Sequence, residues 1–183
     1  MNIFIHRRDL RYEDNTTLLD LYSKFRYFIP IFIFDPIQIE KKKNKYYSNN
    51  LVQFLCSSLL DLKYRYKKLN IDLNIFYGDT IKVLDDLNKN NEINSISFNI
   101  DYSPFSKNRD TNIIGWCNKN SINCFNNEDM LLIDINSGRG LKPSNNEPYL
   151  VFTPFTRNLK KYDVNIPNNT KIKKKKKKSR NNF

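Results

Sequence analysis

A chain of 183 residues has room for one ordinary domain with a real hydrophobic core. Apolar residues make up 39% of it and aromatic residues 14%, which excludes a chain that is disordered throughout. The net charge is +12, no apolar run is long enough to cross a bilayer, and charged residues begin too early for a secretory signal. The composition therefore predicts a folded, basic protein without a membrane segment.

The cysteine and histidine content argues against both a disulfide framework and a zinc site. Cys56, Cys117 and Cys124 are odd in number and follow no paired or metal-binding spacing. His6 is the single histidine and cannot complete a zinc site with them, so it is predicted to be an ordinary loop or core residue. We therefore expect reduced thiols, no metal and an intracellular protein, either cytoplasmic or nuclear.

The positive charge is concentrated at one end of the chain. Residues 160–183 hold nine lysines and one arginine against one aspartate, and so carry nine of the twelve net charges. This contrast predicts a folded domain over residues 1–159 and a basic, low-complexity, disordered tail over residues 160–183. Such a tail could bind nucleic acid weakly and without sequence preference, through the phosphates. The alternative is a solvated end in a chain that is rich in Asn, Lys and Ile throughout.

Short apolar runs alternate along the chain with segments of helical periodicity. Strands are predicted at residues 2–5, 29–34, 71–77, 95–100 and 122–125, and helices at 16–25, at 48–69, from Thr80 and from Pro104. This alternation predicts an α/β fold: a Rossmann-like, doubly wound sheet of mostly five parallel strands with helices on both faces. No glycine-rich phosphate loop follows the first strand, so a dinucleotide-binding domain is not supported.

Local signals mark several boundaries of these elements. Residues 14–15 offer a cap for the first helix, and Asp79 offers one for the helix after a turn at Gly78. Ser103 followed by Pro104 is typical of a helix start. The long helix has apolar residues at helical spacing that predict one buried face: Leu51, Leu55, Leu59, Leu62, Tyr66 and Leu69.

Three further features complete the expected organisation. Residues 37–47 are polar and lysine-rich, and are predicted to form a surface loop. Trp116 shares a helix face with Ile113 and Cys117, and is predicted to be a core residue. The apolar, aromatic segment at 149–155 cannot lie free in water, so it either packs on the edge of the domain or docks another domain.

Polar residues follow several of the predicted strands at the point where each strand ends. The first strand is followed by Arg8 and Asp9, the second by Asp35, and the fourth ends at Asn99 and Asp101. Ligands bind beyond the carboxyl ends of the strands in open α/β sheets, so these residues predict a shared crevice. The alternative is that Asp9 and the neighbouring arginines form a local ion-pair cluster that only shapes the loop.

Several segments, taken together and in order, resemble the DNA photolyase and cryptochrome family. The resemblance extends over residues 2–160 and is carried by residues 7–11 with 14–15, by 29–36, by Asn50 to Leu62, by Gly78-Asp79, by 98–104 with Arg109-Asp110, and by 149–155. It implies the N-terminal α/β domain of that family, which holds an antenna chromophore, typically a folate or a deazaflavin. It also implies a helical partner domain that binds FAD and splits pyrimidine dimers in DNA.

The sequence stops where the helical domain would begin in that family. The resemblance therefore implies a truncated or split deoxyribodipyrimidine photolyase-like protein, whose light-dependent DNA repair requires a separately encoded FAD-binding helical domain. FAD is expected only in that helical part. No residue of this chain is assigned a catalytic role, and whether the chain acts as an enzyme stays open.

By position, the resemblance places the chromophore at the strand ends. The candidate residues are Arg8, Asp9, Leu10, Asp35, Asn99, Asp101 and Tyr102. Carboxylates and amides there could hydrogen-bond a pterin-like or flavin-like ring, and Arg8 could hold an anionic tail. The alternative is a crevice that stays empty until a second domain completes it.

Two other functions remain open at this point. The chain could be an inactive relic that folds without activity. It could also be a stand-alone module that uses the basic tail for nucleic acid and the crevice for a small ligand.

Overall fold

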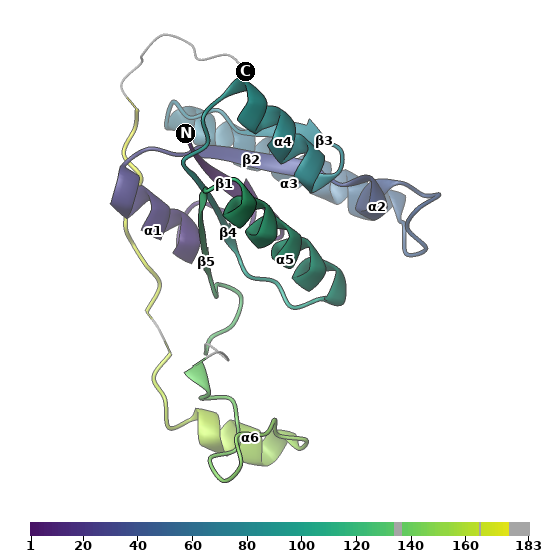
Figure 1. Cartoon of the computed structure of the whole chain (residues 1–183). Helices are drawn as coiled ribbons and strands as arrows, with labels where there is room; N and C mark the ends of the chain where they lie inside the picture. Colours follow the sequence, from purple (N-terminus) through teal and green to yellow (C-terminus); the bar gives the residue numbers. More distant parts are fainter. Residues whose placement is uncertain (134–136, 165, 176–183) are drawn as a thin grey trace.

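The computed structural model describes residues 1–133, 137–164 and 166–175 (Figure 1). In these residues five parallel strands form a sheet in the order β3-β2-β1-β4-β5. The strands are β1 (Asn2–His6), β2 (Ile29–Phe34), β3 (Asn74–Tyr77), β4 (Ser95–Asn99) and β5 (Asn123–Asn127). The helices are α1 (Thr16–Phe25), α2 (Pro36–Ile39), α3 (Asn49–Lys68), α4 (Thr80–Asn90), α5 (Pro104–Lys119) and α6 (Phe152–Leu159). The predicted doubly wound parallel sheet is confirmed.

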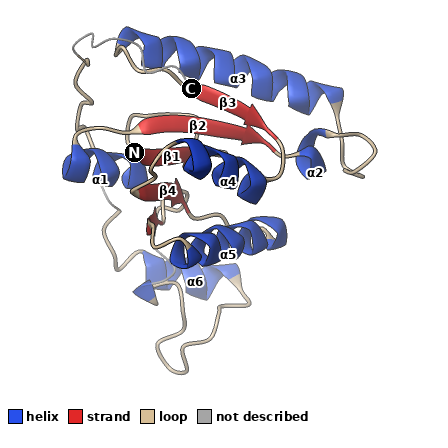
Figure 2. Ribbon diagram, turned by 45° about the horizontal axis from the view of Figure 1, so that its top comes forward, coloured by secondary structure: helices blue, strands red, loops and turns tan. Residues whose placement is uncertain are grey.

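The sheet lies between two layers of helices (Figure 2). Alternate residues of each central strand face opposite sides of the sheet, so each face contributes its own apolar side chains to a core. Ile3 and Ile5 of β1 belong to one core with α4 and α5, whose members include Leu84, Ile113 and Trp116. Phe4 belongs to the other core with α1 and α3. Both faces of β1 are therefore apolar, as expected of a strand buried on both sides.

The residues predicted to cap the helices form the expected hydrogen bonds at the helix N-termini. Asn15 caps α1 by accepting a hydrogen bond from the backbone N–H of Leu18. The Asp79 carboxylate accepts from two backbone N–H groups in the first turn of α4. Gly78 before it has φ +143°, a conformation that favours glycine. Ser103 caps α5, whose first residue is Pro104.

Three elements differ from the prediction by more than one residue at an end. Residues 37–47 are not wholly a loop, because Asp35 accepts a hydrogen bond from the backbone N–H of Ile37 and starts the short helix α2. Strand β3 begins at Asn74 instead of residue 71, although Ile71 and Leu73 are buried in the core. Strand β5 covers Asn123–Asn127, a little later than residues 122–125. Ile71 and Leu73 thus show that a buried apolar residue need not belong to a strand of the sheet.

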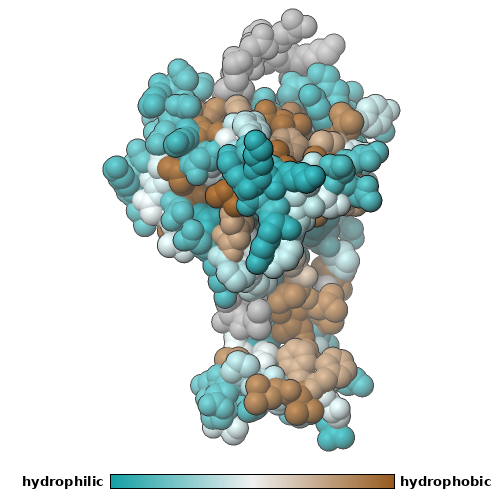
Figure 3. Space-filling view, turned by 90° about the vertical axis from the view of Figure 1, so that its right-hand side faces the viewer, coloured by the Kyte–Doolittle hydropathy of each residue, from teal (hydrophilic) through white to brown (hydrophobic). Residues whose placement is uncertain are grey.

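The apolar segment at 149–155 runs into α6, which lies apart from the sheet (Figure 1). This helix packs on the loop before it: the Asn158 side chain donates to the backbone oxygen of Arg139 at 3.0 Å, and the Tyr149 and Phe155 rings lie 5.9 Å apart. Leu150 and Phe152 remain 92% and 77% exposed. Figure 3 shows hydrophobic side chains gathered on this part of the molecule.

Residues 166–175 run along α1 as an extended segment, and we call the described residues from 168 to 175 the strap. The strap contributes Ile172, 6% exposed, to the core that contains α1 and α3. The domain boundary at residue 159 stays a prediction, whereas the strap, which lies within the tail predicted to be disordered, follows a described path and packs on the domain. Residues 176–183 of the predicted tail lie outside the described residues.

Trp116 is buried in the core, as predicted, and its indole N–H donates to the Asp85 carboxylate at 2.6 Å. The three cysteines are free thiols: Cys56 is exposed, Cys117 buried and Cys124 half-buried. Within the described ranges, no helix has both the length and the apolar character that crossing a membrane requires.

Ile172 offers a direct test of the strap. We expect Ile172→Ala to lower the free energy of unfolding by about 2 kcal/mol, because it removes a buried side chain from the α1/α3 core. The matched control is Ile166→Ala, since Ile166 is 87% exposed in the same extended segment. Urea unfolding followed by circular dichroism measures both. Equal midpoints for the two variants would show that Ile172 does not pack.

Candidate functional site

A cavity of about 460 Å³ opens at the carboxyl edge of the sheet. Its volume falls within the range of small-molecule sites, and it lies where the strand order reverses beside β1. The ends of β1 and β2 form its floor, and its walls come from α2, from the first turns of α3 and from the middle of α5. It is lined by Ile5, His6, Arg7, Arg8, Leu10, Phe32, Ile33, Phe34, Asp35, Gln38, Ile39, Asn44, Leu51, Phe54, Leu55, Thr80, Asp101, Arg109 and Ile113.

The structure brings four of the seven candidate residues to this cavity: Arg8, Leu10, Asp35 and Asp101. The other three, Asp9, Asn99 and Tyr102, are close in sequence to lining residues but do not line it. That any of the seven binds a chromophore stays a prediction. Their positions nevertheless follow from the parallel sheet, whose strand ends meet at this edge.

Asp9 and Asn99 form the centre of a buried polar cluster under the cavity. The Asp9 carboxylate accepts from the Asn99 side chain at 2.7 Å, from the Asn15 side chain at 3.1 Å and from the backbone N–H of Arg7 at 2.8 Å. The Asn99 side-chain oxygen accepts from the backbone N–H of Thr17 at 3.1 Å. These bonds join β1, β4 and α1. The local structural role considered for Asp9 therefore exists, but its side-chain partners are amides instead of arginines.

Arg8 and Asp101 pair at the rim of the cavity. The Arg8 Nε lies 3.2 Å from the Asp101 carboxylate, and the Arg8 side chain is 65% exposed. Asp101 also accepts from the Ser106 hydroxyl at 2.9 Å and from the backbone N–H of Tyr102 at 2.7 Å. Asp101 thus fixes the entry into α5. Asp35 similarly serves α2 as its cap, so both carboxylates have structural partners at the cavity wall.

Arg7 is a charged lining residue that was not among the predicted candidates. Its guanidinium lies over the Phe98 ring, 4.1 Å from the centroid, and its side chain is only 7% exposed. The Nη1 atom donates to the Asp110 carboxylate at 2.7 Å and to the backbone oxygen of Asn99 at 3.2 Å. The Nε and Nη2 atoms have no hydrogen-bond partner in the part of the chain that the structure describes.

Arg109 lies beside Arg7 and shares its carboxylate. The Arg109 Nε is 3.4 Å from the same Oδ1 atom of Asp110, and its Nη2 is also buried without a partner among the described residues. Two guanidinium groups therefore share one carboxylate oxygen, while the other oxygen of Asp110, Oδ2, is itself buried without a partner among the described residues. Sequence reasoning placed Arg109 and Asp110 only in a motif.

Burial, followed by the positive charge of Arg109, lowers the pKa of Arg7 to about 10, and Asp110 opposes this shift. Arg7 still carries its charge at neutral pH. Buried donors without acceptors cost free energy, more so when they belong to a charged group. An anionic ligand group that reached these nitrogen atoms would supply the acceptors that they lack.

Apolar side chains on the first turns of α3 form the opposite wall. Leu51 and Phe54 line the cavity and are 54% and 75% exposed. The prediction that Leu51 lies on the buried face of the long helix is therefore wrong, because α3 extends past the sheet at this end. Leu59, Leu62 and Tyr66 of the same stripe are buried. The exposed wall gives the cavity a surface on which a planar ring could pack.

His6 closes the floor from the end of β1 and is 1% exposed. Its Nδ1 lies 3.0 Å from the backbone oxygen of Asp9, which can only accept, so Nδ1 carries the proton. The neutral Nε2 then accepts from the Tyr66 hydroxyl at 2.8 Å. Burial lowers the pKa of His6, although the Asp9 carboxylate opposes the shift. His6 was predicted to be an ordinary loop or core residue, and its burial confirms the second of these.

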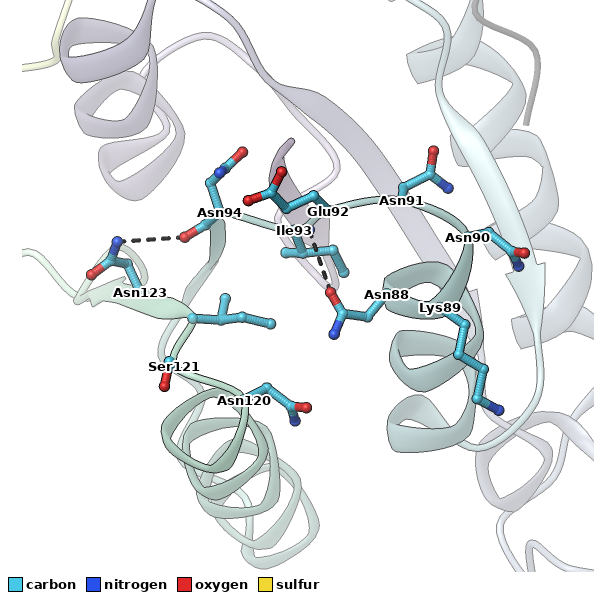
Figure 4. A pocket seen from close by; sticks show the side chains of 11 residues that line it. Asn88, Lys89, Asn90, Asn91, Glu92, Ile93, Asn94, Asn120, Ser121 and Asn123 are labelled. Atoms are coloured by element: carbon cyan, nitrogen blue, oxygen red, sulfur yellow. Dashed lines mark hydrogen bonds between the residues drawn. The ribbon is translucent and has the colours of Figure 1, made fainter.

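A second hollow, of about 640 Å³, lies at the opposite, amino edge of the sheet (Figure 4). Asparagines dominate its lining, and two of them bond to local backbone: Asn88 accepts from the N–H of Ile93, and Asn123 donates to the oxygen of Asn94. These amides complete the loops after α4 and α5. We assign the functional site to the carboxyl-edge cavity, which has buried charges without full pairing.

Comparison with known proteins identifies the family that this chain matches. The family described as DNA photolyase matches residues 2–173. A crystal structure of an archaeal photolyase from Sulfolobus tokodaii with two FAD molecules is 37% identical, with a TM-score of 0.77 over 90% of this chain and 36% of that one.

Two curated relatives match smaller shares of their own length. Cryptochrome-1 of Anopheles gambiae is 31% identical over 134 residues, which is 69% of this chain and 24% of the relative. An uncharacterised 31.6 kDa protein of Synechococcus is 26% identical over 158 residues, which is 86% of this chain and 54% of the relative. The chain thus spans from about a quarter to about half of these curated relatives.

The histidine predicts a specific dependence of stability on pH. The folded pKa of His6 lies below the ordinary value of about 6.5, so the unfolded chain binds the proton first as the pH falls. We expect the free energy of unfolding to be highest above about pH 6.5 and to fall from there toward the folded pKa. Since this is the single histidine, one imidazole NMR signal reports the titration. A folded pKa at or above the ordinary value would contradict the expectation, and His6→Asn should remove this component.

Proposed function

Because this chain belongs to the DNA photolyase family, we propose that its sheet domain holds a light-harvesting antenna chromophore in the carboxyl-edge cavity. The observation that carries the proposal is the pair Arg7 and Arg109, two residues that line that cavity and whose Nε and Nη2 (Arg7) and Nη2 (Arg109) atoms are buried without a partner among the described residues. A cavity of about 460 Å³ accommodates a fused-ring chromophore. The photolyase of Sulfolobus tokodaii, which holds two FAD molecules, supports a ligand of this kind.

The two walls of the cavity favour a ligand with two chemically distinct parts. A planar heteroaromatic ring would pack on Leu51 and Phe54, and an anionic group would accept from Arg7 and Arg109. Folates, deazaflavins and FAD all combine such a ring with phosphate or carboxylate groups. The residues present therefore fit an antenna chromophore, which would supply light absorption while the chain binds and orients it.

We further propose that the chain acts with an FAD-binding helical domain, which would carry light-dependent splitting of pyrimidine dimers in DNA. The exposed apolar residues Leu150, Val151 and Phe152 at the start of α6 support a docking role for this segment. The matched relatives extend well beyond the length that this chain covers. Under this proposal the isolated chain gathers light and does not by itself catalyse repair.

Chromophore binding can be measured by titrating the purified chain with FAD, a reduced folate and a deazaflavin while following fluorescence. We expect at least one of them to bind, and Arg109→Gln to weaken that binding about tenfold or more, because it removes a charged hydrogen bond. Phe54→Ala should weaken it about fivefold, because the ligand ring then loses the exposed aromatic side chain of the α3 wall. Arg65→Gln is the matched control, since Arg65 pairs with Glu13 outside the cavity and its replacement should change nothing. If none of the three binds the unaltered chain, the proposal fails.

The docking proposal is tested separately, by coexpressing the chain with the helical domain of the Sulfolobus tokodaii photolyase. We expect the two parts to copurify, and the double variant Leu150→Ser/Phe152→Ser to reduce the complex at least tenfold, because it replaces the apolar docking surface with hydroxyl groups. Leu60→Ser provides the control, because Leu60 is 67% exposed on α3, outside the proposed docking segment. Equal reductions in both variants would show that this segment does not dock the partner.

A further inference from the structure

The strap is held in place by hydrogen bonds to α1 and to the end of α3. The backbone N–H of Asn168 donates to the Asp14 carboxylate at 2.7 Å, and that of Lys173 donates to the Tyr22 hydroxyl at 3.0 Å. Lys175 is fixed on both sides: its N–H donates to the oxygen of Leu69 at 2.9 Å, and its own oxygen accepts from the Asn70 side chain at 2.7 Å. The backbone of this lysine-rich segment therefore has a defined path.

Ile172 determines which side chains of the strap face outward. Successive side chains of an extended segment point to opposite sides, so burial of Ile172 directs Lys171 and Lys173 to solvent. Lys171, Lys173 and Lys174 are exposed. Among the described residues no carboxylate forms an ion pair with any of the three. The sequence continues with three more lysines at 176–178.

The helix ends beside the strap add further cations. Arg26 follows α1 and lies over the Tyr22 ring, whose hydroxyl binds the strap. Lys67 and Lys68 end α3, immediately before the residues that bind Lys175. The Lys175 ammonium lies 3.8 Å from the centroid of the Tyr27 ring. Asp72 is the acidic residue that faces this group, and it already pairs with Lys67 at 3.0 Å.

We propose that the strap and the ends of α1 and α3 form one binding face for the phosphate backbone of nucleic acid. This basic face comprises Arg26, Lys68, Lys171, Lys173, Lys174 and Lys175. It lies toward the amino edge of the sheet, so it is separate from the cavity at the carboxyl edge. An anchored row of ammonium groups meets a row of phosphates with less loss of chain entropy than a free tail does.

The chemistry of this face favours nucleic acid over an anionic membrane. Basic segments that bind membranes also present apolar side chains for insertion into the lipid. Within the strap the one aliphatic residue is Ile172, which is buried in the core; the exposed Ile166 of the same extended segment lies before the strap, at the end away from its lysines. The exposed side chains of the strap are lysine, asparagine and threonine, which match phosphate groups through charge and hydrogen bonding.

Binding of the full chain to a fluorescent 20-base-pair DNA duplex, measured by anisotropy from 50 to 200 mM KCl, tests the proposal. We expect affinity to fall steeply with salt, and the triple variant Lys171→Gln/Lys173→Gln/Lys174→Gln to bind at least tenfold more weakly. For each phosphate that the variant no longer neutralises, the salt slope should become about 0.9 shallower. The matched control removes the same charge elsewhere, with Lys41→Gln/Lys42→Gln/Lys45→Gln in the loop after α2, and should bind as the unaltered chain does.

Anchoring is tested without any change of charge. The double variant Tyr22→Phe/Asn70→Ala removes two hydrogen-bond partners of the strap backbone. The variant Ile172→Ser removes the buried side chain of the strap. Each should weaken binding to the duplex several-fold, although every lysine remains. Circular dichroism verifies the fold of each variant. If Ile172→Ser does not fold, the result for the milder variant Tyr22→Phe/Asn70→Ala is the one that counts. Unchanged affinity after removal of the anchors, or an equal weakening in the loop control, overturns the proposal. So does tighter binding to vesicles with anionic lipid than to the duplex.

Discussion

The Asp9 carboxylate determines how β1 ends, and the cavity depends on it. Its hydrogen bonds to Asn15 and Asn99 tie the central strand to α1 and β4, and its bond to the backbone of Arg7 fixes the turn that follows. The side chains of Arg7 and Arg8 leave this turn in different directions. Arg7 reaches Asp110 inside the molecule, whereas Arg8 reaches Asp101 at the rim. A buried carboxylate with amide partners thus places the guanidinium groups that characterise the site.

Much of the fold could be predicted from the sequence because its signals are local. The apolar runs of β1, β2 and β4, the cap at Asn15 and the Ser103-Pro104 start depend on neighbours within a few residues. The short helix α2 was missed because its signal, Asp35 before a proline, was interpreted only as the end of a strand. Strand β3 was predicted too long because Ile71 and Leu73 are buried without joining the ladder.

The candidate site was harder to predict because it depends on which way each strand-end side chain turns. Asp9 and Asn99 have the chemistry of ligand-binding groups, yet their hydrogen bonds are made to each other and to Asn15. Arg7 is sequence-adjacent to Arg8 but contacts Asp110, more than a hundred residues away. Nothing within a few residues encodes that pairing. The exposed position of Phe54 likewise follows from the extension of α3 past the sheet edge, which helical periodicity does not reveal.

The Ile172 contact has a consequence for the order in which the protein acquires its structure during translation. The ribosome delivers all five strands, together with α1 and α3, well before it delivers the strap. Until then the apolar depression that receives Ile172 is open to water and to other polypeptides. The nascent domain therefore passes through a stage in which its sheet is complete but one patch of its core is uncovered.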